Sequence, residues 1–171
     1  PPFTAQNLQR EFNVPVVANP EFLSEKTAEY DAKHPDFILI GADLPQYAQA
    51  VRGLYEARFK GTDIIETDTV TAETAKLAMN ALYATKVIFA NEIYDYCQKS
   101  GANYETVKQT LYNSKYVGKH HLDIFHKGGR GAGGKCLKKD LEGFTTITGS
   151  ELLRVVDRIN KELLAGYPKN E

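Results

Sequence analysis

Short apolar segments alternate with longer amphipathic stretches over the first third of the chain. Three of these segments, VPVVANP (14–20), FILIGAD (37–43) and DIIETDTV (63–70), are bounded by Pro, Asn, Gly or Asp and are typical of strands. Between the second and third segments, residues 43–59 carry apolar side chains at helical spacing. A strand, a helix and a strand in this order predict a βαβ unit within an α/β lobe of about three strands.

The period of the apolar positions changes to that of a long helix after residue 70. Residues 71–100 contain neither Gly nor Pro, and Gly101 provides a C-terminal stop. Thr71 is a favourable N-cap, and Glu73 places an acid in the first turn, where the helix dipole favours it. Because apolar side chains cover most of its circumference, we expect this helix to be buried in a helical lobe or in a subunit interface.

Two shorter helices are predicted over residues 103–114 and 150–166, the second with Ser150 as its cap. The predicted fold class is therefore a partial α/β lobe over residues 1–70, followed by an all-α lobe over residues 71–171 that is built on the long helix.

Charge is distributed unevenly along a chain whose formal net charge is only −1. This balance argues against a polycation that binds nucleic acid or an anionic membrane over its whole surface. Between residues 115 and 139, however, seven Lys or Arg and three His accompany a single acid, Asp123. This local excess indicates a bound anionic ligand.

Two cysteines, Cys97 and Cys136, are far apart in sequence and have no metal-ligand spacing, so we expect reduced thiols, a cytoplasmic protein and no metal site. No apolar run approaches the roughly 18 residues of a membrane span, and no signal-like segment opens the chain. The sequence begins without Met, and we expect it to be part of a longer protein.

A glycine-rich stretch, KGGRGAGGKCLKKD (127–140), matches two nucleotide-binding patterns incompletely. Gly129, Gly131 and Gly134 satisfy G-x-G-x-x-G, while Cys136 stands where a P-loop has Ser or Thr. Both motifs require a buried strand in front, and the preceding HHLDIFHK is too polar for one. A flexible basic turn is the plainer explanation of the stretch taken alone.

Two other stretches combine with the glycines to suggest a site. NPEFLSE (19–25) places Glu21 and Glu25 just after a predicted strand, at the end where ligands bind in open α/β sheets. ETAKLAMN (73–80) places Lys76 and Asn80 one turn apart on an otherwise apolar helix, where polar groups are costly unless they are paired or used. Each has a structural explanation by itself, as a helix-start acid, a snorkelling lysine or a packed hydrogen-bonding amide.

Together, in this order and spacing, the three stretches resemble the nucleotide-sugar dehydrogenases of the UDP-glucose 6-dehydrogenase and GDP-mannose 6-dehydrogenase family. The resemblance implies the end of an N-terminal cofactor-binding domain and a helical central domain similar to that of 6-phosphogluconate dehydrogenase. Ala132 replaces an aromatic residue of the family pattern, Lys138 replaces a proline, and His120 stands where UDP-glucose enzymes tend to have an arginine.

The resemblance implies oxidation of a sugar C6 alcohol to a carboxylate by two hydride transfers to NAD, with UDP-glucose the favoured substrate. Cys136 would add to the intermediate aldehyde and form a thiohemiacetal and then a thioester, and the lysines around it would favour its thiolate. Lys76 and Asn80 would stabilise the charged oxygen, and Glu25 and Asp140 would move protons during hydrolysis.

The resemblance also implies the binding contacts. The substrate-binding residues are expected to be Glu21, Phe22, Leu23, Lys76, Asn80, His120, Lys127, Gly129, Gly131 and Gly133. Cys136 and Lys139 would contact NAD, which would be bound mainly by a domain outside this chain. A homodimer is expected to form through the helix of residues 71–100.

Several alternatives remain open at this point. The substrate could be GDP-mannose or UDP-N-acetylmannosamine, or the chain could be a dimerisation or binding module without catalysis. An anion- or RNA-binding domain is disfavoured, because the basic glycine stretch lacks interleaved aromatic residues on which bases would stack.

Overall fold

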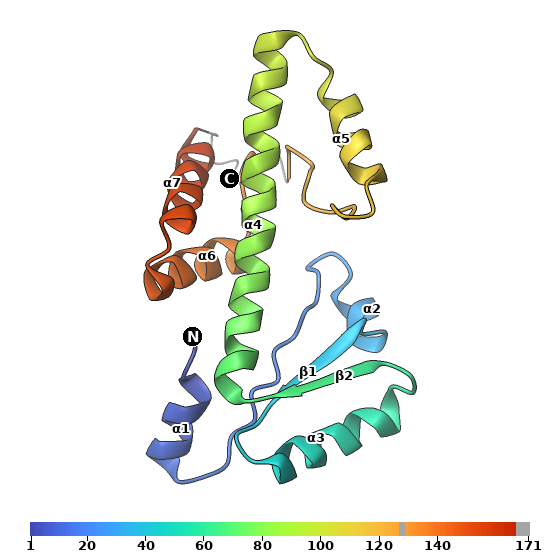
Figure 1. The fold of residues 1–171 in the computed structure, drawn as a ribbon, viewed down its shortest axis with the longest axis vertical. Coiled ribbons are helices and arrows are strands. Elements are labelled where there is room, and N and C mark those ends of the chain that lie inside the picture. Colours follow the sequence, from blue (N-terminus) through green and yellow to red (C-terminus); the bar gives the residue numbers. More distant parts are fainter. Residues whose placement is uncertain (127–128, 167–171) are drawn as a thin grey trace. The chain divides into compact units, whose positions relative to one another are not determined.

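Seven helices and two strands make up the part of the chain described by the structure, a computed structural model covering residues 1–126 and 129–166 (Figure 1). The chain divides into two compact units, Pro1–Ala78 and Met79–Glu171. The elements in chain order are α1 (Thr4–Phe12), α2 (Ala28–Lys33), β1 (Phe37–Gly41), α3 (Pro45–Arg58), β2 (Asp63–Thr67), α4 (Thr69–Ser100), α5 (Tyr104–Asn113), α6 (Lys135–Thr148) and α7 (Glu151–Ala165).

The first unit contains the predicted βαβ arrangement. β1 and β2 pair in parallel, with Ile38 opposite Ile64, and α3 connects them. Ile38 and Ile40 of β1 are buried and pack with Ala48 of α3, which forms the centre of this small core. The apolar segments and the helix between them therefore fold as their patterns predict.

The expected third strand, over residues 14–20, does not form. Ala18 makes one isolated antiparallel bridge with Gly41, and the sheet of the described residues has two strands. Pro15 has no N–H with which to continue a ladder. The side-chain amide of Asn19 donates to the Leu39 carbonyl at 2.7 Å and so takes an acceptor that a neighbouring strand would use.

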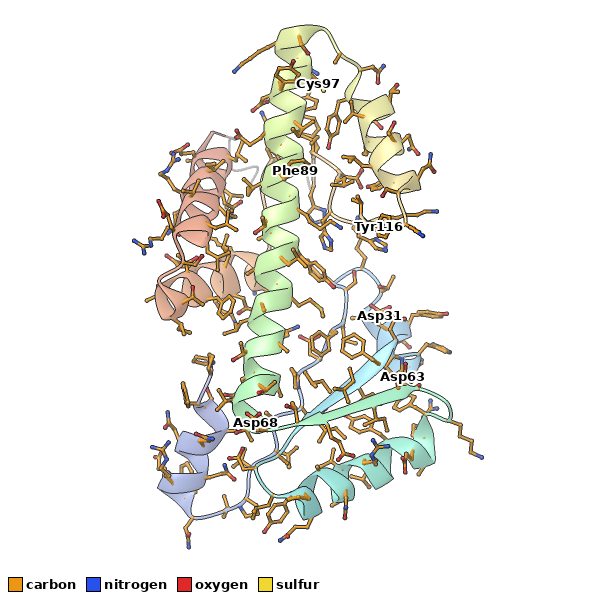
Figure 2. The ribbon with its side chains drawn as sticks, in the orientation of Figure 1. Asp31, Asp63, Asp68, Phe89, Cys97 and Tyr116 are labelled. Atoms are coloured by element: carbon orange, nitrogen blue, oxygen red, sulfur yellow. The ribbon has the colours of Figure 1, made fainter. Side chains whose placement is uncertain are left out.

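Helix α4 begins at Thr69, two residues before the predicted start. The carboxylate of Asp68 accepts hydrogen bonds from the Thr71 N–H at 2.8 Å and from the Thr71 hydroxyl at 2.6 Å. Asp68 therefore acts as the N-cap in place of Thr71, at the junction of β2 and α4 (Figure 2). At the other end the prediction is confirmed, because α4 ends at Ser100 and Gly101 adopts a left-handed φ of 76°.

The predicted first-turn acid of α4, Glu73, serves a second helix. Its carboxylate accepts from the N–H groups of Thr4 at 3.1 Å and Ala5 at 2.8 Å, at the start of α1. α1 itself was not predicted, because its polar residues outnumber its apolar ones and its buried residue is only Ala5.

In the second unit, α6 and α7 pack on one side of α4 and α5 packs on the other (Figure 1). Both shorter predicted helices form, and Ser150 caps α7 by accepting from the Leu153 N–H at 3.3 Å. α6 was not predicted as a helix. One core cluster joins α4 to the glycine-rich stretch, α6 and α7 through Ala81, Ala84, Val87, Ile88, Ala132, Leu141 and Val156.

Within the described residues, even the 32-residue α4 lacks the continuous apolar length that a membrane-spanning helix requires.

Candidate active site

The glycine loop, residues 129–134, packs against helix α7 through Gly131 and Ala132, which are buried. Asn160 of α7 is fully buried, and its amide makes two hydrogen bonds with the backbone of Ala132. The Ala132 N–H donates to Asn160 Oδ1 at 2.7 Å, and Asn160 Nδ2 donates to the Ala132 carbonyl at 3.2 Å. The side chain of Asn160 thus pairs with the loop backbone much as a strand would.

Gly131 is required by this packing. Its φ is 83°, and a Cβ atom there would lie 2.9 Å from Asn160 Oδ1 and 3.2 Å from Leu163 Cβ. The space that the missing side chain leaves is therefore occupied by the protein's own helix α7. A substrate contact of Gly131, which was expected from the resemblance, stays a prediction.

Arg130 connects the same loop to helix α4. Its guanidinium donates from Nε to Asn91 Oδ1 at 2.8 Å and forms an ion pair with Asp95 at 2.8 Å. It also lies over the Tyr94 ring, 5.3 Å from its centroid. Asn91 is fully buried and donates in turn to the Val87 carbonyl, so the loop has hydrogen-bonded partners on α4 as well as on α7.

Cys136 lies in the first turn of α6, directly after the glycine loop. Gly134 enters the helix with a φ of 82°, and the Cys136 thiol is exposed. The free N–H groups of a first turn stabilise negative charge that develops beside them. Cys97, by contrast, is 2% exposed and packs in the core beneath α5, so Cys136 is the accessible thiol of the two (Figure 2 labels Cys97).

One turn further along α6, Asp140 accepts a hydrogen bond of 2.6 Å from Asn80 Nδ2 of α4. Both side chains are buried, and this contact ties Asn80 to the helix that carries Cys136. Lys139 is exposed, with its ammonium 3.4 Å from Asp140 Oδ1. The structure therefore brings together Asn80 and Asp140, two of the predicted site residues, within the second unit.

A second group of predicted residues clusters in the first unit. The ammonium of Lys76 donates to the Glu21 carbonyl and lies 3.2 Å from Glu21 Oε1. It also lies 5.2 Å from the centroid of the Phe22 ring. The Glu21 carboxylate accepts from the Leu23 N–H at 2.7 Å, while Glu25 is exposed in the same segment.

His120 is exposed on the segment that follows α5, and its ring is 6.3 Å from that of His121. His121 has a left-handed φ of 69° and stacks on Tyr83 of α4 at 4.2 Å. Its Nδ1 is buried and has no hydrogen-bond partner among the described residues. Burial, and then the nearby Lys86 and His120, lower the pKa of His121. Lys127, another predicted substrate contact, lies outside the described residues.

Sequence reasoning missed the residues that hold the glycine loop, namely the buried Asn91 and Asn160 and the partly buried Arg130 of the loop itself. A signal was present for Asn160, because it occupies the apolar stripe of α7 that is otherwise formed by Leu153, Val156 and Leu163. An amide on such a stripe is costly unless both of its ends are bonded. Among the described residues, no three His, Cys, Asp or Glu side chains gather closely enough to hold a metal ion.

Comparison with known proteins places these features in a single class of dehydrogenases. The chain belongs to the UDP-glucose/GDP-mannose dehydrogenase family, because the model of that family's central domain matches residues 70–162. The model of the family's NAD binding domain matches residues 3–59. The resemblance noted from the three sequence motifs is thereby confirmed.

Individual relatives agree with the family assignment. The chain is 37% identical over 160 residues to the UDP-glucose 6-dehydrogenase YwqF of Bacillus subtilis, covering 91% of this chain and 35% of that protein. A solved UDP-glucose dehydrogenase from Pyrobaculum islandicum is 31% identical, with a TM-score of 0.75 over 86% of this chain and 34% of that one. GDP-mannose dehydrogenase from Pseudomonas aeruginosa is 30% identical, with a TM-score of 0.55 over the same shares. The chain spans about a third of the length of these relatives.

Proposed function

We propose that this chain carries the catalytic thiol of an NAD-dependent nucleotide-sugar 6-dehydrogenase, with UDP-glucose as its substrate. The observation that carries the proposal is the arrangement on α6. Cys136 is exposed in the first turn of α6. Asp140, one turn later, is buried and accepts a hydrogen bond from Asn80. A nucleophile beside a paired carboxylate and amide is suited to covalent catalysis at a carbonyl carbon.

The proposed chemistry has four steps. The C6 alcohol of the sugar loses a hydride and a proton and becomes an aldehyde. The Cys136 sulfur then adds to the aldehyde carbon, and the resulting thiohemiacetal loses a second hydride and a proton to become a thioester. Water attacks the thioester carbon, the C–S bond breaks, and the products are the sugar carboxylate and the free thiol.

Asn80 and Asp140 have separate tasks in this scheme. The Asn80 amide donates to the oxygen on which negative charge develops, an interaction typically worth about 100- to 1,000-fold in rate. Asp140 orients Asn80 in the resting site through their 2.6 Å hydrogen bond and accepts a proton from the attacking water. Lys76 as a second donor and Glu25 as a second proton carrier stay predictions from the family resemblance.

NAD, when bound, accepts the two hydrides. Residues 3–59 match the family's NAD binding domain, but β1 leads into α3 through residues 42–44 without a glycine turn for the pyrophosphate. We therefore expect groups outside these 171 residues to hold most of the dinucleotide, with contacts from Cys136 and Lys139 on this chain.

The relatives support UDP-glucose, since curated relatives from Bacillus subtilis and two Rickettsia species are named UDP-glucose 6-dehydrogenases. The likeness to GDP-mannose dehydrogenase supports GDP-mannose as the second candidate substrate.

We assign the end of the cofactor domain to residues 1–70 and the helical central domain to residues 71–171. The cytoplasm is the expected compartment, because both cysteines are free thiols.

Replacing Cys136 with Ser in the complete enzyme tests the proposal. We expect production of the sugar acid to fall below detection, while calorimetric binding of UDP-glucose changes little. The matched control is Cys97→Ala, which removes the buried thiol and should retain activity. Full carboxylate production by Cys136→Ser would refute the assignment of the nucleophile.

We also propose that the chain forms a homodimer along α4. Leu82, Phe89 and Tyr96 recur every seven residues along this helix and are 58%, 51% and 65% exposed (Figure 2 labels Phe89). Such a stripe of large apolar side chains is typical of a helix that pairs with a second copy. Phe89→Glu should halve the mass measured by light scattering. Leu152→Glu, at an exposed apolar position of α7, is the matched control and should leave the mass unchanged.

The 171-residue chain by itself is expected to be catalytically silent, because it contains no strand-led glycine fingerprint for NAD. An NADH absorbance assay with UDP-glucose tests this expectation. Steady NADH production would contradict it. Dimerisation without activity in any longer form of the protein would favour the non-catalytic module instead.

A further inference from the structure

We infer that Asn160 is a positioning residue: it fixes the glycine loop and, through the loop, the first turn of α6 that carries Cys136. The catalytic consequence of this inference rests on the proposed function. The mechanical part does not, because it concerns the order of the loop and of the thiol in the chain itself.

The composition of the loop explains why a single side chain can have this effect. Residues 131–134 read Gly-Ala-Gly-Gly, so the largest side chain among them is the methyl group of Ala132. With so little to pack, residues 131–134 can be held mainly through their own N–H and carbonyl groups. Asn160 bonds both backbone groups of Ala132, at 2.7 and 3.2 Å, and the Gly133 N–H donates to the Gly131 carbonyl at 3.0 Å.

The burial of Asn160 argues that these two bonds are specific. Its neighbours on the same stripe of α7 are Leu153, Val156 and Leu163, so an apolar residue would satisfy packing alone. A fully buried amide is costly unless its donor and acceptor are both paired. Gly131, with a φ of 83° and only 2.9 Å between its Cβ position and Asn160 Oδ1, completes the fit between loop and helix.

Cys136 lies between two anchors. Upstream, Ala132 is bonded to Asn160, and downstream, Asp140 is buried and bonded to Asn80. Between Ala132 and the start of α6 lie only Gly133 and Gly134, the most flexible residues available. Loss of the upstream anchor should therefore loosen the first turn of α6, while the rest of the helix stays held by Asp140 and Leu141.

A spin label on Cys136 in the 171-residue chain measures this directly. A thiol-specific nitroxide should attach to the exposed Cys136 and spare the buried Cys97, with labelling near one per chain checked by mass spectrometry. For Asn160→Ala we expect a new mobile component in the electron paramagnetic resonance spectrum.

The matched control is Val156→Ala, which removes a buried side chain from the same helix and cluster that cannot hydrogen-bond to the loop backbone. We expect it to lower Tm by a similar amount and to leave the label spectrum unchanged. The inference is overturned if both variants mobilise the label equally, or if Asn160→Ala leaves it immobile.

Hydrogen exchange at the Ala132 amide is the second readout. In Asn160→Ala, the protection factor of the Ala132 amide should fall relative to those of the core amides of α4. The expected relative fall is about fivefold, which corresponds to the loss of one net hydrogen bond. Asn160→Asp keeps the shape and the acceptor for the Ala132 N–H, so it should restore most of this protection. If Asn160→Ala does not fold, Asn160→Asp is compared with Val156→Ala instead. In Asn160→Asp, a protected Ala132 amide together with a partly mobile label supports the inference. A label in Asn160→Asp that is as immobile as in the unchanged chain refutes it.

Kinetics of the complete enzyme test the catalytic consequence of the inference. Asn160→Ala should lower kcat by on the order of 10- to 100-fold with a smaller change in KM, because misplacement of a catalytic group acts on the chemical step. A mobile label with unchanged kcat would overturn the catalytic consequence and leave the mechanical one standing. If Cys136→Ser proves fully active, the proposed function fails, whatever the label shows.

Discussion

The glycine loop and the segment of residues 19–25 both carry predicted site residues on irregular backbone, yet they are held in opposite ways. The loop is bonded by Asn160, a neutral and fully buried amide. In residues 19–25, the predicted site residue Glu21 is bonded through charged groups at the surface, where Lys76 contacts its side chain, which is 58% exposed. The segment with the smallest side chains is therefore the more deeply embedded of the two.

Burial decides what each kind of contact is worth. A buried donor or acceptor that loses its partner cannot turn to water, so breaking such a contact costs about 1–3 kcal/mol. An exposed ion pair exchanges its partner for water and salt, and typically contributes about 0–1 kcal/mol. We therefore expect substitutions near the loop to affect stability more than substitutions in residues 19–25.

Gly131→Ala is expected to have the largest effect. A left-handed φ of 83° disfavours a side chain there, and the added Cβ would lie 2.9 Å from Asn160 Oδ1. Backbone strain and overpacking together should lower the free energy of unfolding by about 2–4 kcal/mol. Urea denaturation followed by circular dichroism measures the loss.

Gly133→Ala is the matched control, because its nearest neighbour would be Leu164 Cδ2 at an ordinary 3.9 Å. It should cost less than about 1 kcal/mol. Equal losses for the two variants would mean that the loop is not packed against α7 as closely as described.

Asp140→Ala tests the buried contact beside the thiol. It would leave Asn80 Nδ2 buried without its 2.6 Å acceptor, and we expect unfolding to become easier by about 1–3 kcal/mol. Glu142→Ala, on the same helix, breaks an exposed 3.1 Å ion pair with Lys161 and should cost at most about 1 kcal/mol. A small effect of Asp140→Ala would place that carboxylate in contact with water.

Glu21→Ala addresses the exposed side of the comparison. The Glu21–Lys76 ion pair should contribute less than about 1 kcal/mol, since the Glu21 side chain is more than half exposed. Its contribution should also disappear at about 1 M salt, where the screening length is near 3 Å. Denaturation of the variant and the unchanged chain at low and high salt gives the difference. A contribution that survives high salt would contradict the assignment of this contact as an ordinary surface pair.

His121→Phe probes a half-buried titratable group and has the smallest expected effect. The pKa of His121 is lowered from its ordinary value of 6.5, first by burial and then by Lys86 and His120. Just below pH 6.5 the unfolded chain binds a proton at His121 and the folded chain does not, so stability decreases as the pH falls through this window. Phe keeps the stacking on Tyr83 and should flatten the decrease. An unchanged Tm profile between about pH 5 and 7 would show that His121 is not the group responsible.

Much of the fold followed from local patterns, and the failures have specific causes. β1, β2 and α4 were predictable because their apolar periods are strong and their ends carry clear signals such as Gly101. The strand over residues 14–20 failed because Asn19 uses a side chain where a strand would use its backbone. α6 was missed because lysines and a glycine run obscure its start.

The prediction of the site residues also rested on strong local patterns and failed where distant residues meet. Motif spacing predicted Cys136, Asn80 and Asp140 as site residues. The structure joins Asn80 to Asp140 by a hydrogen bond, and the roles of all three stay predictions. The residues that hold the loop could not be predicted from the sequence, because Asn160 lies 28 positions from its partner Ala132 and nothing local couples them. A polar residue on the apolar stripe of a helix indicates a buried hydrogen bond but does not identify its partner.

The attachment of α1 has a consequence for protease resistance in acid. Asp43 accepts from Gln9 of α1 at 2.9 Å and from the Thr69 hydroxyl at 2.8 Å, and so links α1 to the start of α4. Burial alone would raise the pKa of Asp43, but its hydrogen bonds lower the pKa overall from the ordinary value of 3.8. The link is therefore fully present above pH 3.8 and is lost as the pH falls through the pKa of Asp43 in the folded chain. With Ala5 as its buried residue, α1 should then be the first element to detach. An acid protease such as pepsin would be expected to trim these N-terminal residues before it cuts either core.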